Sequence, residues 1–268
     1  AGQGVDVVPR PMACDPSLHC AAYEWIEGTP VANAGRTDIE ELADFFLRLQ
    51  SLRGREGALS LPLASAACLS AAQALGQAKA RLQRLTDAGP HDEALALFLK
   101  NELIPGFKRI EQEALAGLRT AGIDPSAELA KERQVLSPSD FGRHNLLRCA
   151  DGRLAFVDFE YFGWDDPVKA VADVLLHPGS AFNKSQGGIF KDRVAFVLSQ
   201  GDAQFEDRFR CLFPVYAVIW CLILLNEFLP ERLARRQMAG QAEDARTAQR
   251  RQLQKAQAML KRSRDEQD

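Results

Sequence analysis

The sequence predicts an α+β fold that is mostly helical. Long segments repeat apolar residues every three to four positions, the spacing that gathers them on one face of a helix. The clearest such segments lie at residues 37–54, 92–118 and 205–229. Two shorter stretches, near the N-terminus and at residues 154–159, have the apolar runs and flanking turns of strands. A chain of 268 residues with 46% hydrophobic residues is long enough for one large domain or two smaller ones with real cores.

The N-terminal strands are expected at Val5–Pro11 and Leu18–Ile26, joined by a turn at Asp15-Pro16-Ser17. Cys14 and Cys20 could face each other across this hairpin, although small buried apolar residues are the commoner role of such cysteines. The six cysteines of the chain form no CxxC pair and no zinc-ligand pattern with its four histidines. This usage indicates a reduced, cytoplasmic protein.

The first long helix is expected to begin at the capping-box pattern Thr37-Asp-Ile-Glu40 and to end at Gly54. An Ala-rich helix follows at Ser65–Leu85. The next, Asp92–Leu118, contains an interruption near Pro105-Gly106, because proline removes a helical hydrogen bond. Further along, a helix at Val168–Leu176 ends before Pro178, a polar loop covers residues 179–188, and helices cover residues 190–198 and 205–229.

The last of these helices contains the continuous apolar run Val215–Leu225. A bilayer span needs about 20 such residues, so the run predicts a buried central helix and not a membrane segment. From Glu231 onward the chain carries ten basic and six acidic residues, which predicts a solvated charged helix or tail. A basic face for an anionic partner is the alternative. The net charge of −3 argues against nucleic-acid binding driven by overall charge.

The densest group of polar residues lies within Leu136–Pro178. Asp140 and Asn145 are five positions apart on a segment whose Pro138, Gly142 and flanking serines favour a loop, and Asp158 follows an apolar strand. Phosphoryl transfer needs one carboxylate for the attacking hydroxyl and hard oxygen ligands for magnesium. Asp140 would orient or deprotonate the acceptor hydroxyl, while the Asn145 amide oxygen and the Asp158 carboxylate would hold the metal. Each residue could also serve structurally, as a turn residue, a cap and a strand-end carboxylate.

Three segments occur in the order found in the aminoglycoside phosphotransferase and choline kinase family, small-molecule relatives of the protein kinases. Asp140-Phe-Gly-Arg-His-Asn145 resembles its catalytic loop, Asp158-Phe-Glu160 its metal-binding segment and Asp166-Pro167 the Gly-Asp-Pro that follows. The resemblance implies the large lobe of a protein-kinase-like fold with a remnant of the small lobe. It also implies transfer of the γ-phosphoryl group of ATP, with Mg²⁺, to a hydroxyl of an amino sugar, amino alcohol or sugar. An unrelated helical domain is the alternative fold.

The resemblance extends to further binding residues. Tyr23–Gly28 is similar to the linker between the two lobes, which makes the Glu24 carbonyl and the Ile26 amide the partners expected for adenine. Glu160 and Asp165 are the residues expected at an acidic substrate rim. The implied division is residues 1–28 for small-lobe strands and linker, 29–230 for the helical lobe and 231–268 for the tail. Oligomeric state is left open.

The chain departs from the family pattern at the catalytic loop. Pro138-Ser139 stands where the family usually has His-Gly, so a residue that normally braces the loop is absent. Ala170 replaces an Asp that often hydrogen-bonds this loop. Asp173, on the same helix face one turn on, is expected to substitute for it beside Asp166 as loop support.

The start of the chain also departs from the family pattern. Gly2 and Gly4 have no strand before them, and no lysine occurs before Lys79. The chain is therefore expected to be a fragment that begins near the fourth small-lobe strand. A non-catalytic binding or regulatory relative, or an inactive fragment of the enzyme, is the alternative function.

Overall fold

A computed structural model describes residues 5–89, 92–180, 182–232 and 244–265. The predictions that concern Gly2, Gly4 and residues 233–243 lie outside these ranges. The chain divides into two compact units. Unit 1 takes the described parts of Ala1–Ser65, Leu136–Trp164 and Asp173–Val197, and unit 2 takes those of Ala66–Val135, Asp165–Ala172 and Leu198–Asp268.

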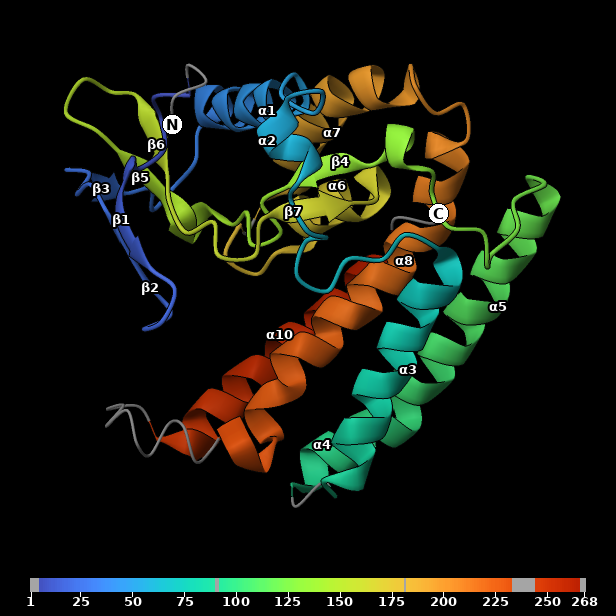
Figure 1. Cartoon of the computed structure of the whole chain (residues 1–268). Coiled ribbons are helices and arrows are strands. Elements are labelled where there is room, and N and C mark those ends of the chain that lie inside the picture. The colour runs from blue at the N-terminus through green and yellow to red at the C-terminus, as the bar shows by residue number, and fades with distance from the viewer. Residues whose placement is uncertain (1–4, 90–91, 181, 233–243, 266–268) are drawn as a thin grey trace. The chain divides into compact units, whose positions relative to one another are not determined.

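The strands of the described residues are short and form three small sheets (Figure 1). They are β1 (Pro11–Asp15), β2 (Cys20–Tyr23), β3 (Thr29–Pro30), β4 (Val135–Ser137), β5 (Leu146–Arg148), β6 (Leu154–Phe156) and β7 (Gly163–Asp165). β1 pairs with β2, β4 pairs with β7, and the third sheet has the order β3-β5-β6. In this third sheet, β5 runs antiparallel to both β3 and β6.

Helices make up most of the described chain. They are α1 (Arg36–Gln50), α2 (Glu56–Leu59), α3 (Ala71–Asp87), α4 (Glu93–Phe98), α5 (Ile104–Thr120), α6 (Pro167–Leu176), α7 (Lys184–Ser199), α8 (Phe205–Leu224) and α10 (Ala245–Asp265). Between α4 and α5 the helix continues through a π-helical turn, Leu99–Leu103, just before Pro105. The predicted interruption is therefore a change of helical pitch that accommodates the proline.

The N-terminal hairpin exists, but the prediction misplaced its first strand. β1 pairs Asp15 with Cys20 and Pro11 with Tyr23, whereas the expected strand ended at Pro11. The preceding residues lie instead beside β6, because the Val7 carbonyl accepts a 2.8 Å hydrogen bond from the Phe156 amide. Cys14 pairs with Ala21 and not with Cys20, and both cysteines are free and exposed.

Three helix starts also differ from the prediction. α3 begins at Ala71 and not at Ser65, because the Ser70 side chain caps it. Thr37 lies inside α1, whose first turn is capped two positions earlier, at Gly35, by a 2.8 Å hydrogen bond from the Gly35 amide to the Asp38 carboxylate. The polar loop expected up to residue 188 is shorter, because α7 begins at Lys184. Asn183 and Gln186 form a reciprocal capping box at 2.9 and 3.0 Å, which starts the helix there.

Unit 1 is held by α1 and α7, which pack through the edge-to-face contact of Phe46 with Phe190. The bidentate ion pair of Arg193 with Asp44, at 2.6 and 2.9 Å, joins the same two helices. On its other side α1 presents Phe45, whose ring stacks on Phe156 of β6 with centroids 3.9 Å apart. α1 thus packs against both α7 and strand β6 of the β3-β5-β6 sheet.

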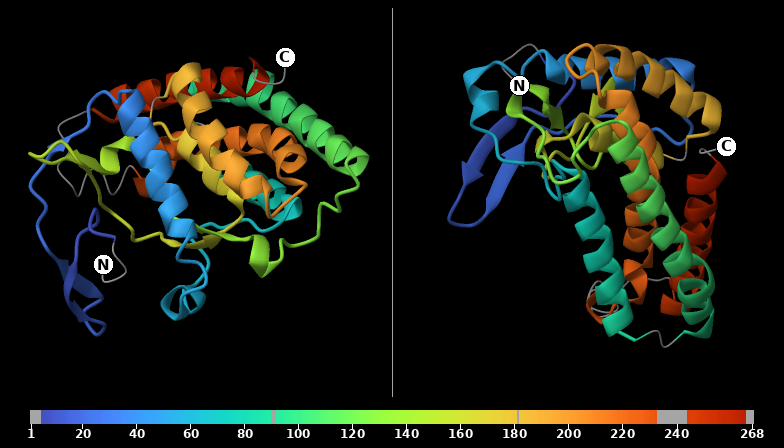
Figure 2. Two further views of the ribbon diagram at one scale, coloured as in Figure 1. Left: turned by 90° about the horizontal axis from the view of Figure 1, so that it is seen from above. Right: turned by 90° about the vertical axis from the view of Figure 1, so that its right-hand side faces the viewer.

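Unit 2 is a bundle in which α3, α5 and α10 pack against α8 (Figures 1 and 2). Phe205–Phe228 is the one described helical segment long and apolar enough, by length and composition, to cross a membrane. Of its apolar window, 72% is buried inside the structure, as the prediction of a buried central helix requires.

The described part of the tail forms α10, which is partly buried, whereas the sequence predicted a solvated helix or tail. Ala248, Leu253, Ala256 and Leu260 are buried, and α10 packs along α8. The Cys221 thiol of α8 donates a 3.4 Å hydrogen bond to the Ala256 carbonyl. The helix is therefore amphipathic, since sparse apolar residues at helical spacing were enough to give it a contact face.

Candidate active site

The β5–β6 ladder brings Asn145 and Asp158 to the same end of one sheet. Asn145 directly precedes β5, and Asp158 follows β6 by two positions. Leu146 pairs with Phe156 in the ladder, and one step further the Val157 amide donates a 3.0 Å hydrogen bond to the Asn145 carbonyl. The two residues expected to hold a metal are thus fixed side by side by main-chain bonds.

The predicted linker is tied to the same sheet through β3. Thr29 pairs with Arg148, and the Val31 amide donates to the Leu146 carbonyl at 3.2 Å. A Cβ atom on Gly28 would lie 2.9 Å from the Leu147 Cβ atom, so this close approach requires glycine.

Within the linker, the Glu24 amide donates to the Arg10 carbonyl at 2.9 Å, and the Glu24 carboxylate pairs with the Arg10 side chain at 2.7 Å. Ile26 is half-buried. The adenine contacts of the Glu24 carbonyl and the Ile26 amide stay a prediction.

The loop that carries Asp140 is held in a tight, strained conformation. Ser139 has a φ of 65°, and the Asp140 amide donates a 2.8 Å hydrogen bond back to the Pro138 carbonyl, which closes a γ-turn. The Ser139 hydroxyl donates to the Ser65 carbonyl at 3.2 Å. Residues other than glycine rarely adopt this left-handed region, and such strain persists only where surrounding contacts enforce it.

Asn145 links the two halves of the motif. Its side-chain nitrogen donates a 3.0 Å hydrogen bond to the main-chain carbonyl of Asp140. That bond fixes the amide orientation and turns Oδ1, the atom suited to a hard metal ion, away from the carbonyl. Asn145 is buried, so its position is determined by the loop and the sheet together.

The Asp140 carboxylate is half-buried beside two histidines. Its Oδ1 atom lies 2.9 Å from Nε2 of His177 and 3.4 Å from Nε2 of His144. The His177 contact lowers the pKa of Asp140 below its usual value, against the opposing effect of burial. The group is therefore an ionised acceptor at neutral pH, suited to orienting a hydroxyl.

An aromatic cluster under the motif fixes the loop against the strand. The Phe45 ring lies 5.6 Å from that of Phe141, the neighbour of Asp140, and 6.0 Å from that of Phe159, the neighbour of Asp158. Phe141 and Phe156 stack with centroids 5.7 Å apart. The backbone on both sides of the candidate site thus rests on one side chain of α1.

Asp158 and Glu160 are exposed, and Asp158 has a φ of 65°. Tyr161 stands among the acidic residues. A hydrogen bond with Glu160, together with the charges of Glu160, Asp140 and Asp158, raises the pKa of the Tyr161 hydroxyl. The carboxylates of Asp140 and Asp158 therefore act on the same phenol, which indicates that the loop and the strand end face one region of negative potential.

Asp165 does not suit the substrate rim for which it was predicted. The residue is fully buried, and its Oδ1 accepts hydrogen bonds from the Cys68 amide at 3.1 Å and the Asp166 amide at 2.8 Å. Its other oxygen lies 3.1 Å from Nζ of the buried Lys169. Asp165 is a structural carboxylate, because a buried charge persists only when it is paired.

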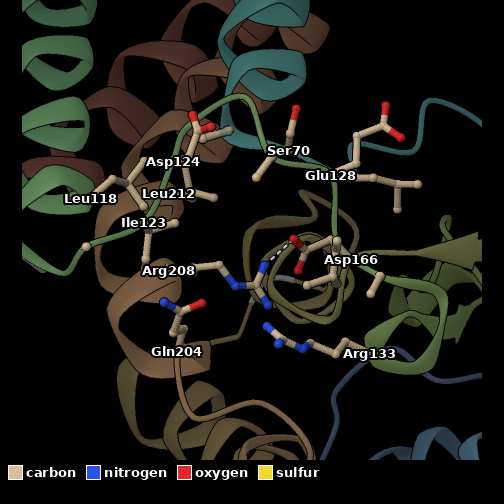
Figure 3. Close-up of a pocket in the computed structure, with 16 residues that line it drawn as sticks. Ser70, Leu118, Ile123, Asp124, Glu128, Arg133, Asp166, Gln204, Arg208 and Leu212 are labelled. Carbon is tan, nitrogen blue, oxygen red and sulfur yellow. Dashed lines mark hydrogen bonds and ion pairs between the residues drawn. The ribbon is translucent and has the colours of Figure 1, made fainter.

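Asp166 caps α6 and belongs to a buried ion cluster of unit 2. Its Oδ1 accepts a 2.7 Å hydrogen bond from the Val168 amide, and Pro167 opens the helix. Its other oxygen pairs with Arg208, which also binds Asp202. Figure 3 shows Arg208 directed at Asp166 where both line a pocket of about 310 Å³. Asp173 is buried on α6, and the loop-support role of both aspartates stays a prediction.

The donor atoms at the end of the β5–β6 ladder fit a hard divalent cation. An amide oxygen held by a buried asparagine and an exposed carboxylate at a strand end are the ligand types that Mg²⁺ takes, usually together with water and phosphate oxygens.

His144 and His177 are site residues that the sequence analysis did not identify. His177 follows the last residue of α6, 37 positions after Asp140, so no local spacing connects the two. The available signal was a histidine placed between a predicted helix and its terminating proline.

Comparison with known families decides the assignment. Residues 1–203 match the model of the phosphotransferase enzyme family. The chain belongs to this family. No curated protein matches the sequence significantly.

Solved structures with the same phosphotransferase fold cover nearly the whole chain. An ethanolamine kinase from Plasmodium vivax is 11% identical, with a TM-score of 0.55 over 96% of this chain and 67% of that one. A choline/ethanolamine kinase family protein from Mesorhizobium loti is 16% identical, with a TM-score of 0.56 over 96% and 76%. A spectinomycin phosphotransferase in complex with ADP and spectinomycin is 12% identical, with a TM-score of 0.55 over 96% and 78%.

These findings confirm the predicted fold class and the family resemblance. The protein is an α+β, mostly helical phosphotransferase of the protein-kinase-like fold. At such low identity the neighbours show the fold alone, and they assign no substrate to this chain.

Proposed function

We propose that this protein transfers the γ-phosphoryl group of ATP to a hydroxyl of a small molecule. The observation that carries the proposal is the hydrogen bond from the Asn145 side chain to the Asp140 carbonyl, together with the bond from the Val157 amide to the Asn145 carbonyl. These two bonds connect the loop of the proton-accepting carboxylate, the amide ligand and the segment after β6 that carries Asp158. Phosphoryl transfer depends mostly on such positioning and on charge neutralisation.

In this proposal each residue has one task. Asp140, ionised and directed by its histidine neighbours, accepts a hydrogen bond from the acceptor hydroxyl and takes its proton as the phosphorus–oxygen bond forms. Asn145 Oδ1 and the Asp158 carboxylate would hold Mg²⁺, which supplies charge neutralisation on the phosphates. The Glu24 carbonyl and the Ile26 amide bind adenine beside β3.

The acceptor is proposed to bear an amine as well as a hydroxyl. Asp158 and Glu160 are exposed. The pKa of the Tyr161 hydroxyl is raised by its hydrogen bond with Glu160, by burial and by the charges of Glu160, Asp140 and Asp158. A cationic amino sugar or amino alcohol suits this negative region, and a neutral sugar is the second choice. Asp165 is not included in the proposed substrate rim, because it is buried. A cytoplasmic location is proposed from the six free cysteines.

Steady-state turnover of the full-length protein tests the proposal. ATP and Mg²⁺ would be supplied with a panel of amino sugars, amino alcohols and neutral sugars, and phosphorylated product would be detected by mass spectrometry. We expect Asp140→Ala to lower kcat about 100-fold or more, the scale of general base catalysis, while nucleotide affinity is unchanged. Asp151→Ala, an exposed aspartate in the β5–β6 turn, is the matched control and should retain activity.

If the protein is instead a non-catalytic relative, no phosphorylated product is expected. A full-length protein that binds nucleotide but gives no product with any acceptor of the panel would favour it over the proposed enzyme. Equal turnover by wild type and Asp140→Ala would also remove Asp140 from the reaction.

A further inference from the structure

His177 contacts the oxygen of Asp140 that solvent does not reach. Oδ1 of Asp140 is screened from solvent and has no partner with hydrogen-bond geometry, but it lies 2.9 Å from Nε2 of His177, while 27% of the whole side chain is exposed. Oδ2 is therefore the oxygen that can meet an acceptor hydroxyl. The inner oxygen is occupied by a histidine that is itself only 13% exposed in its side chain.

A hydrogen bond on the far side of the ring assigns the proton of His177. The Gly179 amide donates to Nδ1 of His177 at 2.9 Å, so Nδ1 presents its lone pair. A neutral imidazole with an unprotonated Nδ1 carries its hydrogen on Nε2. The nearest acceptor atom to Nε2 that the ion-pair distances give is Oδ1 of Asp140, 2.9 Å away.

The surroundings are built for two imidazole rings. His144 stacks on His177 with centroids 4.8 Å apart and planes 20° from parallel. A Cβ atom on Gly142 would lie 2.5 Å from the His144 ring, and a Cβ atom on Gly179 would lie 2.5 Å from the same ring and 2.9 Å from His177. Both glycines therefore leave the space that the stacked pair fills.

A metal ion is the competing occupant of this cluster. Ligand atoms of Asp140, His144 and His177 lie within 4.8 Å of one another. A histidine that binds a metal through Nε2 normally donates its Nδ1 hydrogen to a neighbouring acceptor. His177 has the reverse arrangement, since a main-chain amide donates to its Nδ1.

We infer that His177 is the positioning residue of Asp140, holding the inner carboxylate oxygen through its Nε2 hydrogen so that the outer oxygen faces the acceptor hydroxyl. This inference rests on the proposed function. His177 would brace the loop from the end of α6, in a chain that has Pro138-Ser139 directly before Asp140. The His144 ring stacks on the His177 ring.

Kinetics of the full-length protein test the role in catalysis. We expect His177→Ala to lower kcat about 10- to 100-fold with little change in the KM for ATP, the usual effect of removing the partner that orients a reacting group. His177→Gln should recover most of this loss, because its amide can donate from a similar reach. His19→Ala, in the exposed β1–β2 turn, is the matched control. Full kcat in His177→Ala, or no difference between the Ala and Gln variants, would overturn the inference.

NMR spectroscopy tests the contact of His177 with Asp140 independently of turnover. In ¹⁵N-histidine-labelled protein at a pH where the ring is neutral, long-range ¹H–¹⁵N spectra should show His177 as the Nε2–H tautomer. Asp140→Ala should move the His177 signals and not those of His19. An Nδ1–H tautomer, or a zinc-induced shift of both His144 and His177, would replace the positioning role with a metal site. If the wild-type protein shows no turnover, both the proposed function and the catalytic role of His177 are wrong. The spectra would still show whether His177 contacts Asp140.

Discussion

The side-chain nitrogen of Asn145 donates a 3.0 Å hydrogen bond to the main-chain carbonyl of Asp140, so one buried amide ties the loop of the candidate base to the sheet of the candidate metal ligands. The bond acts together with Phe45, whose ring lies against Phe141, Phe156 and Phe159. The position of Asp140 relative to the β5–β6 ladder therefore depends on packing as much as on the motif itself.

Asp158→Ala should weaken nucleotide binding only when magnesium is present. The substitution removes the carboxylate proposed to hold the ion, whereas the adenine contacts would come from the linker main chain. Calorimetric titration of the full-length protein with a non-hydrolysable ATP analogue, with Mg²⁺ and with EDTA, measures the difference. Asp44→Ala, a surface aspartate of α1, is the control. Equal affinities of wild type and Asp158→Ala in Mg²⁺ would contradict the assignment.

Ser139→Gly should give a more stable protein than Ser139→Ala, by about 1 kcal/mol, because alanine at a φ of 65° keeps the left-handed strain that glycine avoids. Both variants lose the hydroxyl bond to Ser65, so that loss cancels in the comparison. Urea denaturation measures the two free energies of unfolding. In an ordinary helix the order is reversed, and an alanine variant at least as stable as the glycine variant would refute the strained turn.

Arg208→Met should destabilise the protein by about 3–5 kcal/mol, since it leaves the buried carboxylates of Asp166 and Asp202 without their shared cation. Arg210→Met, on the same helix, removes an exposed pair with Asp207 and should cost about 1 kcal/mol or less. The same urea experiment compares the two variants. Similar losses would mean that the Arg208 cluster is not buried in solution.

Cys14 and Cys20 should react quickly with a thiol reagent such as DTNB in the native protein, because both are exposed. Cys68, Cys211 and Cys221 are buried, and burial raises the pKa of the Cys211 and Cys221 thiols, which lowers the thiolate fraction. They should react only after unfolding. Mass spectrometry of alkylated peptides identifies each site, and rapid native labelling of Cys221 would contradict the packing of α10 on α8.

The helices could be predicted from the sequence because apolar spacing is a local property of the chain. Asp140, Asn145 and Asp158 could be singled out because residue type and spacing are also local properties. The N-terminal strand was misplaced, since Val5 and its neighbours look like a strand whether or not a partner strand is present. The start of α7 differs from the prediction because Asn183 and Gln186, which form its capping box, lie in a polar stretch whose composition also suits a loop.

By itself the sequence determined a mostly helical α+β phosphotransferase with Asp140, Asn145 and Asp158 in the order of the family. Only the tertiary structure decided that Asp165 is buried beside Lys169, that α10 covers α8, and that His177 contacts Asp140. The physical reason is the same in each case. Burial and hydrogen-bond partners depend on segments that meet only after folding, and a contact between residues 37 positions apart has no periodicity in the chain to predict it.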